Sequence, residues 1–302
     1  MFPSFIPPAA QNLTEATSIA LAQQIERHPI EVPFTPELIP TSYVSQGSGT
    51  KPIVLLHGFD SSVLEFRRLL PLLGQQKSTW AVDLWGFGFN PRLPGLCFSA
   101  KEIKSHLHSF WQNQINQPVT LVGASMGGAT AIDFTLTYPE AVSELVLLDS
   151  AGLANPPFAT KLMFPPWDRL STEFLRQPFV RGAISRAAYY DKSFNSPDAQ
   201  LCAALHLEIP GWSRGLISFT KSGGYGSFLS RLGQIRQPTL ILWGEEDKIL
   251  GTKDAQKFAQ AIANSKLIWV KSCGHVPHLE QPQIAAQAIL SFLWSQQNQE
   301  NR

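Results

Sequence analysis

Short apolar runs alternate with amphipathic stretches along most of the chain. The apolar runs fall at residues 52–58, 79–86, 118–128, 144–152, 238–247 and 266–270. The spacing typical of amphipathic helices appears at residues 62–73, 99–116, 127–138, 252–264 and 281–296. Runs that are apolar on both faces are typical of buried parallel strands. The pattern therefore predicts an α/β fold with a mostly parallel central sheet flanked by helices.

Residues 152–236 interrupt this alternation. They hold seven prolines and twelve aromatic residues, which predicts a mainly helical insertion that forms a lid (cap) over one end of the sheet. At the other end of the chain, Asn12 and Glu15 have the spacing of a capping box, and apolar residues recur with helical spacing over 13–27. We therefore expect three parts, namely an N-terminal helical extension (1–30), a core (31–151 and 237–302) and the lid (152–236).

Composition narrows the classes of function. Hydrophobic residues make up 44% of the 302, and charged residues only 16%, so the chain can bury a large core. The net charge is +1 and no basic stripe is visible, which argues against a nucleic-acid partner. The three cysteines are far apart, which argues against a disulfide framework or a zinc site. Neither a signal peptide nor an apolar run of about 18 residues is evident, so we expect a cytoplasmic protein without integral membrane association.

The strongest chemical signal is a G-x-S-x-G pattern, Gly123-Ala124-Ser125-Met126-Gly127. A strand-like run precedes it and a helix-compatible stretch follows. Such a strand must turn sharply into the helix, and the glycines leave room for the turn. Ser125 then lies at the apex, near the positive end of the helix dipole, as a candidate nucleophile.

With this elbow, the sequence resembles the α/β-hydrolase superfamily from about residue 35 onward. The resemblance implies a triad in the chain order serine, acid, histidine. His275, in a Gly-His pair after the run at 266–270, would be the general base. His278 lies in the same loop and is the competing candidate, which we expect to pack beside the site or line it.

The resemblance also extends to the acid. Asp247 ends a W-G-x-x-D pattern that begins at Trp243, and in this family that aspartate orients the histidine. Glu245 and Glu246 are neighbouring candidates that we expect to be solvated. Asp149 is a second candidate, because some members of the family place the acid after the preceding strand.

The family stabilises its oxyanion with two backbone N–H groups. The resemblance assigns these to Met126, directly after the nucleophile, and to Phe59 in a His-Gly-x pattern. His57 in that pattern is expected to brace the loop. Asp83 lies in a D-x-x-G-x-G turn that we expect to organise loops, although the family often has proline where Trp85 stands.

Together these features predict a serine hydrolase that cleaves a carboxylic ester, or a related acyl bond, of a small and largely apolar molecule through an acyl-enzyme. The expected partner is thus a small acyl substrate. No cofactor and no metal is required, and the histidines lack ligand spacing. Three alternatives stay open: a carbon–carbon bond hydrolase of ring-fission products, a lyase with the same triad, and a non-catalytic ligand-binding protein of the same fold.

Overall fold

The computed structural model describes residues 1–154 and 165–300. Within these residues, strands join into one eight-stranded sheet in the order β1-β2-β4-β3-β5-β6-β7-β8. Strand β2 pairs antiparallel with β1 and β4, and the other pairs are parallel. The strands are β1 Glu26–Val32, β2 Thr35–Gln46, β3 Ile53–Leu56, β4 Thr79–Val82, β5 Val119–Ala124, β6 Val142–Leu148, β7 Thr239–Gly244 and β8 Ser265–Val270. The predicted α/β class with a mostly parallel sheet is confirmed.

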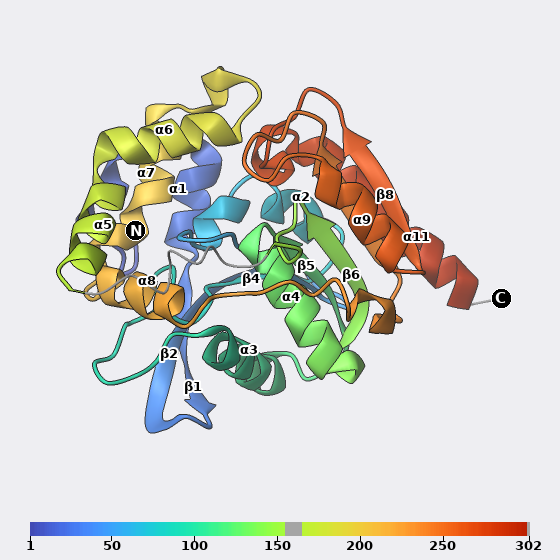
Figure 1. The fold of residues 1–302 in the computed structure, drawn as a ribbon, viewed down its shortest axis with the longest axis horizontal. Coiled ribbons are helices and arrows are strands. Elements are labelled where there is room, and N and C mark those ends of the chain that lie inside the picture. The colour runs from blue at the N-terminus through green and yellow to red at the C-terminus, as the bar shows by residue number, and fades with distance from the viewer. Residues whose placement is uncertain (155–164, 301–302) are drawn as a thin grey trace.

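Helices flank the sheet and fill the connection from β6 to β7 (Figure 1). The α-helices are α1 Ala16–Gln23, α2 Leu70–Gly74, α3 Ala100–Gln114, α4 Met126–Thr137, α5 Trp167–Arg176, α6 Pro178–Ala188, α7 Pro197–Ala204, α8 Trp212–Lys221, α9 Lys253–Ala261, α10 Pro277–Glu280 and α11 Pro282–Glu300. The 3₁₀ helices are η1 Pro8–Asn12, η2 Val63–Phe66, η3 Pro139–Ala141, η5 Lys192–Phe194, η6 Leu205–Glu208 and η7 Leu232–Gln234. None of the helices in the described residues combines the length and the apolar character needed to cross a lipid bilayer.

Residues 152–236, which connect β6 to β7, are called the β6–β7 segment below. Helices α5 to α8 belong to it and lie together at one end of the molecule, on the left of Figure 1. Residues 155–164, with two of its aromatic residues, lie outside the described part. The described part is mainly helical, as its composition predicts.

Two separate cores form because successive strand residues point to opposite faces of the sheet. Along β3, Val54 and Leu56 belong to one cluster, and Ile53 and Leu55 belong to the other. The first cluster includes buried residues of α3, α4 and α9. The second includes residues of α1, α2 and α11. The strands that are apolar on both faces are therefore covered on both faces, which is why they lack an alternating pattern.

The N-terminal region differs from its prediction. Helix α1 ends at Gln23, and residues 26–30 belong to strand β1 at the edge of the sheet rather than to a helical extension. Pro29, within β1, is tolerated there because an edge strand has backbone groups that need no ladder partner. The predicted helix over 13–27 is thus wrong at both ends.

The predicted capping box is also wrong. The N-cap residue of α1 is Glu15, whose side chain makes no cap hydrogen bond. Instead the backbone N–H groups of Thr14 and Glu15 donate to Asp198 Oδ1 in α7, at 2.5 and 2.8 Å, and Ser18 Oγ donates to Asp198 Oδ2 at 2.6 Å. A carboxylate from the β6–β7 segment therefore fixes the residues that lead into α1.

The single helix predicted over 62–73 is two short elements, η2 and α2. Pro71 explains the break, because a proline inside a continuous helix would lack its N–H and clash with the carbonyl four residues earlier. In the structure it lies in the first turn of α2, where a missing N–H is harmless.

Candidate active site

Ser125 lies at the turn between β5 and α4. Its backbone has φ 50° and ψ −116°, a strained conformation for a residue with a side chain. The flanking glycines permit this turn because the backbone on either side of Ser125 passes too close to other backbone atoms to leave room for a Cβ. A Cβ on Gly123 would lie 2.2 Å from the carbonyl oxygen of Gly127, and one on Gly127 would lie 2.0 Å from that of Leu56. The start of α4 is thereby pressed against the end of β3.

Asp247 and His275 are joined by a hydrogen bond. His275 Nδ1 lies 2.9 Å from Asp247 Oδ2, and both side chains are buried. The other carboxylate oxygen, Oδ1, accepts from the backbone N–H groups of Ile249 and Leu250 at 2.7 and 3.1 Å. Burial alone would raise the pKa of Asp247, but the bonds from His275 and these two N–H groups lower it below its ordinary value. The acid is therefore held ionised, facing the imidazole.

Asp149, the competing candidate for the acid, lies beside this pair at the end of β6. Its Oδ1 accepts from the N–H of Gly244 at 3.0 Å. Burial, and next the negative charge of Asp247, raise the pKa of Asp149 well above its ordinary value. Of the two carboxyls, Asp149 is therefore the harder to ionise, and Asp247 is the one whose pKa its surroundings lower. Glu245 and Glu246, in the loop after β7, are exposed, as expected for solvated charges.

The loop after β3 runs alongside Ser125. A Cβ on Gly58 would lie 3.5 Å from the Cβ of Ser125. The N–H of Gly58 donates to Glu65 Oε2 at 2.9 Å, and Glu65 Oε1 lies 3.0 Å from His278 Nε2. Burial would raise the pKa of Glu65, but the contact with His278 outweighs it and lowers that pKa to about 2. His278 thus packs beside the site and steadies the loop through Glu65.

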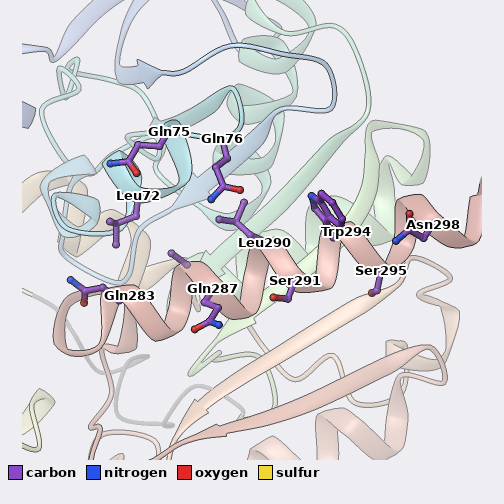
Figure 2. Close-up of a pocket in the computed structure, with 11 residues that line it drawn as sticks. Leu72, Gln75, Gln76, Gln283, Gln287, Leu290, Ser291, Trp294, Ser295 and Asn298 are labelled. Carbon is purple, nitrogen blue, oxygen red and sulfur yellow. The ribbon is translucent and has the colours of Figure 1, made fainter.

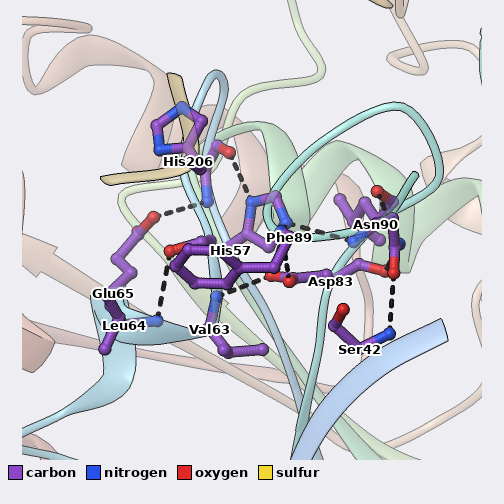
Figure 3. Close-up of polar contacts among 12 residues, drawn as sticks. Ser42, His57, Val63, Leu64, Glu65, Asp83, Phe89, Asn90 and His206 are labelled. Atoms are coloured by element: carbon purple, nitrogen blue, oxygen red, sulfur yellow. Dashed lines mark hydrogen bonds and ion pairs between the residues drawn. The ribbon is translucent and has the colours of Figure 1, made fainter. Parts of the chain in front are cut away.

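His57 and Asp83 brace the same loop from behind (Figure 3). His57 Nε2 accepts from the N–H of Leu84 at 3.1 Å, and His57 Nδ1 lies 2.8 Å from the carbonyl oxygen of Gly58. Burial lowers the pKa of His57 to about 4, so its ring is neutral. The two oxygens of Asp83 accept from the N–H groups of Val63 and Phe89, each at 2.7 Å. The structural roles expected for His57 and Asp83 are confirmed.

Asp60, which follows Phe59, has a role that no sequence pattern indicates. Its buried carboxylate gathers donors from three parts of the β6–β7 segment: Arg181 in α6, His206 in η6 at 3.1 Å and Trp212 Nε1 in α8 at 2.7 Å. Burial would raise the pKa of Asp60, but His206 and then Arg181 outweigh it and hold that pKa well below its ordinary value. The loop beside Ser125 is thereby fastened to the β6–β7 segment. Contacts between residues 121 to 152 positions apart leave no local signal in the sequence.

Ser125 and His275 line a common cavity of about 270 Å³. The loop after β3 contributes Gly58 and Phe59 to its wall, and helices α6 and α7 contribute further side chains. Most of the lining is apolar. The lining residues are Gly58, Phe59, Asp60, Ser61, Leu64, Glu65, Arg67, Ser125, Arg181, Ile184, Ser185, Ala188, Tyr189, Ala199, Cys202, Ala203, Ile249, His275, Val276 and Leu279.

A larger surface cleft of about 680 Å³ lies between α11 and the region of α2 (Figure 2), and it shares no lining residue with the cavity at Ser125. Amide and hydroxyl side chains such as those of Gln75, Gln287 and Ser291 line it beside the ring of Trp294. Its lining holds no charged residue, and it lacks a nucleophile with a neighbouring base. We therefore place the candidate chemistry in the smaller cavity.

Only one group of side chains in the described residues has the spacing to hold a metal ion, and it is the group already described. Ligand atoms of Asp149, Asp247 and His275 lie within 4.8 Å of one another. The hydrogen bond between Asp247 and His275 occupies two atoms that a metal would need, and Asp149 Oδ1 already accepts from the N–H of Gly244. The arrangement is better suited to moving a proton than to binding a cation.

Comparison with known proteins agrees with this geometry. A family model described as "Alpha/beta hydrolase family" matches residues 53–288. The chain is 33% identical over 300 residues to "Alpha/beta hydrolase domain-containing protein VTE7" of Arabidopsis thaliana, covering 96% of this chain and 90% of that protein. It is 28% identical to "2-hydroxy-6-oxo-6-(2'-aminophenyl)hexa-2,4-dienoic acid hydrolase" of Metapseudomonas resinovorans, covering 84% of this chain and 88% of that one.

A solved structure described as a thermophilic esterase from Thermogutta terrifontis superposes with a TM-score of 0.77 at 23% identity, over 89% of this chain and 98% of the other. At that identity the likeness speaks for the fold alone. The family match spans most of the sheet and the loops around Ser125. The sheet order, the elbow at Ser125 and this match together show that the chain belongs to the alpha/beta hydrolase family.

Proposed function

We propose that the protein is a serine hydrolase that cleaves a carboxylic ester of a small, largely apolar substrate. Ser125 is the nucleophile, His275 the general base and Asp247 the acid that orients it. The observation that carries the proposal is the 2.9 Å hydrogen bond between His275 and an ionised Asp247, with His275 and Ser125 lining one cavity. With Nδ1–H donated to Asp247, the imidazole has Nε2 free to accept a proton.

The reaction then proceeds in two steps. Ser125 Oγ bonds to the ester carbonyl carbon while its proton passes to His275 Nε2, and that proton leaves with the alcohol as the ester C–O bond breaks. Water next attacks the acyl-enzyme, giving its proton to His275, which returns it to Ser125 as the carboxylic acid leaves. Asp247 stays ionised throughout and stabilises the imidazolium.

Two backbone N–H groups support the developing oxyanion in this proposal, those of Met126 and Phe59. Met126 is the first residue of α4, so its N–H has no acceptor within the helix and stands at the positive end of the helix dipole. Phe59 follows Gly58, which borders Ser125 directly. Preorganised donors of this kind account for about 10²- to 10³-fold in rate each.

The β6–β7 segment is proposed to serve as the lid of this site, with the bounds 152–236. Helix α6 contributes Arg181, Ile184 and Ser185 to the cavity wall, and α7 contributes Ala199 and Cys202. A substrate in the cavity would therefore be enclosed between the sheet edge and these helices. The mainly apolar wall supports an apolar acyl group.

A carbon–carbon hydrolase is the second candidate, because the Metapseudomonas resinovorans relative is named as a hydrolase of a dienoic acid. The same three residues would serve it. A panel of p-nitrophenyl esters of graded acyl length, assayed beside a ring-fission dienoate, separates the two. The ester proposal requires the esters to be turned over with the higher kcat/KM.

A fluorophosphonate probe tests the nucleophile itself. Wild-type protein should become labelled in a single position, and Ser125→Ala should take up no label. Ser150→Ala is the matched control, because Ser150 lies beside the start of α4 yet is 1% exposed and donates to the carbonyl of Ala151. Labelling of Ser125→Ala at the wild-type level would end the proposal.

A further inference from the structure

Helix α5 turns its apolar side toward the solvent. Trp167, Leu170 and Phe174 follow the spacing i, i+3, i+7 and so share one face of the helix. They are 60%, 56% and 57% exposed, whereas Asp168 and Thr172 on the opposite face are 3% and 1% exposed. An amphipathic surface helix normally has the reverse arrangement. In Figure 1 this helix lies at the outer edge of the molecule.

The orientation of α5 is fixed from inside. Asp168 Oδ2 accepts from Lys221 Nζ of α8 at 2.6 Å, and Leu175 packs against the core on that side of the sheet. Rotating the apolar side inward would break this ion pair and leave a carboxylate without its partner. The exposed face is therefore a stable feature of the fold.

The apolar surface continues onto α6. Phe179 is 67% exposed, and its ring packs edge-on against that of Phe174 with 6.0 Å between centroids. We call Trp167, Leu170, Phe174 and Phe179 the aromatic face. Contiguous exposed apolar side chains of this size mark interaction sites on proteins.

Basic residues border the aromatic face on one side of α5. The exposed ionisable residues of α5 and α6 are Arg169, Arg176 and Arg186 against Glu173. Residues 165–236 hold nine basic and five acidic residues, a net charge of +4, in a chain whose total is only +1. The surplus of positive charge thus lies on the same segment as the aromatic face.

We propose that the aromatic face docks on a lipid bilayer that carries anionic phospholipids. Tryptophan and phenylalanine side chains insert at the boundary between headgroups and acyl chains, and the arginines attract the anionic headgroups. Helix α6 leads from Phe179 to Ile184, which lines the cavity, so docking would hold the cavity beside the lipid.

The test is co-sedimentation with extruded vesicles of phosphatidylcholine, with and without phosphatidylglycerol. Wild-type protein should bind the mixed vesicles and lose binding as salt rises. The double variant Phe174→Ser/Phe179→Ser should bind at least ~10-fold more weakly, and Arg169→Gln/Arg176→Gln should lose the preference for phosphatidylglycerol. Trp294→Ser is the matched control, because Trp294 is 65% exposed on α11 in a cleft without charge.

Three results would overturn the proposal. Wild type could fail to bind the vesicles, or Trp294→Ser could lose as much binding as Phe174→Ser/Phe179→Ser. The protein could also self-associate in the absence of vesicles and lose this association in Phe174→Ser/Phe179→Ser, which would indicate a second copy as the partner of the face. Turnover of a water-soluble p-nitrophenyl ester should stay unchanged in Phe174→Ser/Phe179→Ser, since neither residue lines the cavity. That assay keeps docking and catalysis separate, because docking does not depend on the proposed ester chemistry.

Discussion

Replacing Asp60 with alanine is expected to be among the most damaging single changes outside the triad. The substitution removes the acceptor of Arg181, of His206 Nε2 and of the indole N–H of Trp212. Arg181 and Asp60 are only 17% and 7% exposed, so water replaces little of what is lost. Breaking a buried charge pair from one side costs about 3–5 kcal/mol, against a total stability of roughly 5–15 kcal/mol for a domain.

Urea denaturation of purified wild type and Asp60→Ala measures this loss directly. In thermal unfolding, at about 2–4 °C per kcal/mol for a large domain, the melting temperature should fall by roughly 10 °C. Asp254→Ala is the control, because Asp254 forms an i, i+3 ion pair with Lys257, and the two side chains are 25% and 53% exposed. That exposed pair should contribute about 0.5 kcal/mol or less.

A double-mutant cycle with Arg181→Met isolates the pair. Because Asp60→Ala leaves the buried guanidinium of Arg181 with backbone carbonyls but without an opposite charge, removing the guanidinium as well should recover about 2 kcal/mol of the lost stability. In folded Asp60→Ala protein, kcat for a p-nitrophenyl ester should drop at least ~10-fold, because Asp60 holds the loop that carries the N–H of Phe59. Two results would show that Asp60 does not tether the loop. One is a free energy of unfolding of Asp60→Ala within about 1 kcal/mol of the wild-type value, and the other is a cycle without coupling between the two residues.

Three further outcomes are expected. Asp247→Asn should lower kcat by about 10⁴-fold. Asp149→Asn should lower it far less, because Asp149 Oδ1 accepts from the N–H of Gly244 and it is Asp247 that bonds to the imidazole; stopped ester turnover in Asp149→Asn alone would reverse the assignment. Burial lowers the pKa of His57 to about 4, so between about pH 6.5 and 4 this residue binds a proton only in the unfolded state. Its contribution to the free energy of unfolding should therefore fall by about 3 kcal/mol over that range; urea titrations should show a shallower pH dependence in His57→Gln, and an unchanged slope would mean that His57 is not held neutral. Gly127→Ala should prevent correct folding or abolish probe labelling of Ser125, because its Cβ would lie 2.0 Å from a backbone carbonyl oxygen. Gly182→Ala in α6, whose nearest contact would be 3.7 Å away, should be neutral or stabilising by up to ~1 kcal/mol. Similar melting curves and labelling for the two variants would argue against a tightly packed elbow.

The sequence predicts those parts of the fold that depend on local patterns of residues. Strands such as β5 and β7 are short apolar runs because both faces are covered, and that signature is visible without any partner. The candidate residues of the site follow the same rule. Ser125, Asp247 and His275 each stand shortly after a strand, in motifs of five residues or fewer, so each is recognisable alone.

The parts that escaped prediction depend on distant partners. Strand β1 forms because Glu26 to Val32 pair with β2, and Pro29 within it favours no regular element by itself. Asn12 and Glu15 have the spacing of a cap, yet a carboxylate more than 180 residues away takes that place. The hydrogen-bond donors to Asp60 come from three elements at separations above 120 residues, which no window of sequence can reveal.

The bonds from Asp198 to the residues around the start of α1 also set an order of events during synthesis. The ribosome makes α1 early, but the carboxylate that accepts from Thr14, Glu15 and Ser18 emerges 180 to 184 residues after them. Eight residues are too few to form a stable helix alone, and α1 packs in a core whose other members are made later. The start of the chain therefore reaches its native contacts only after the β6–β7 segment has been made.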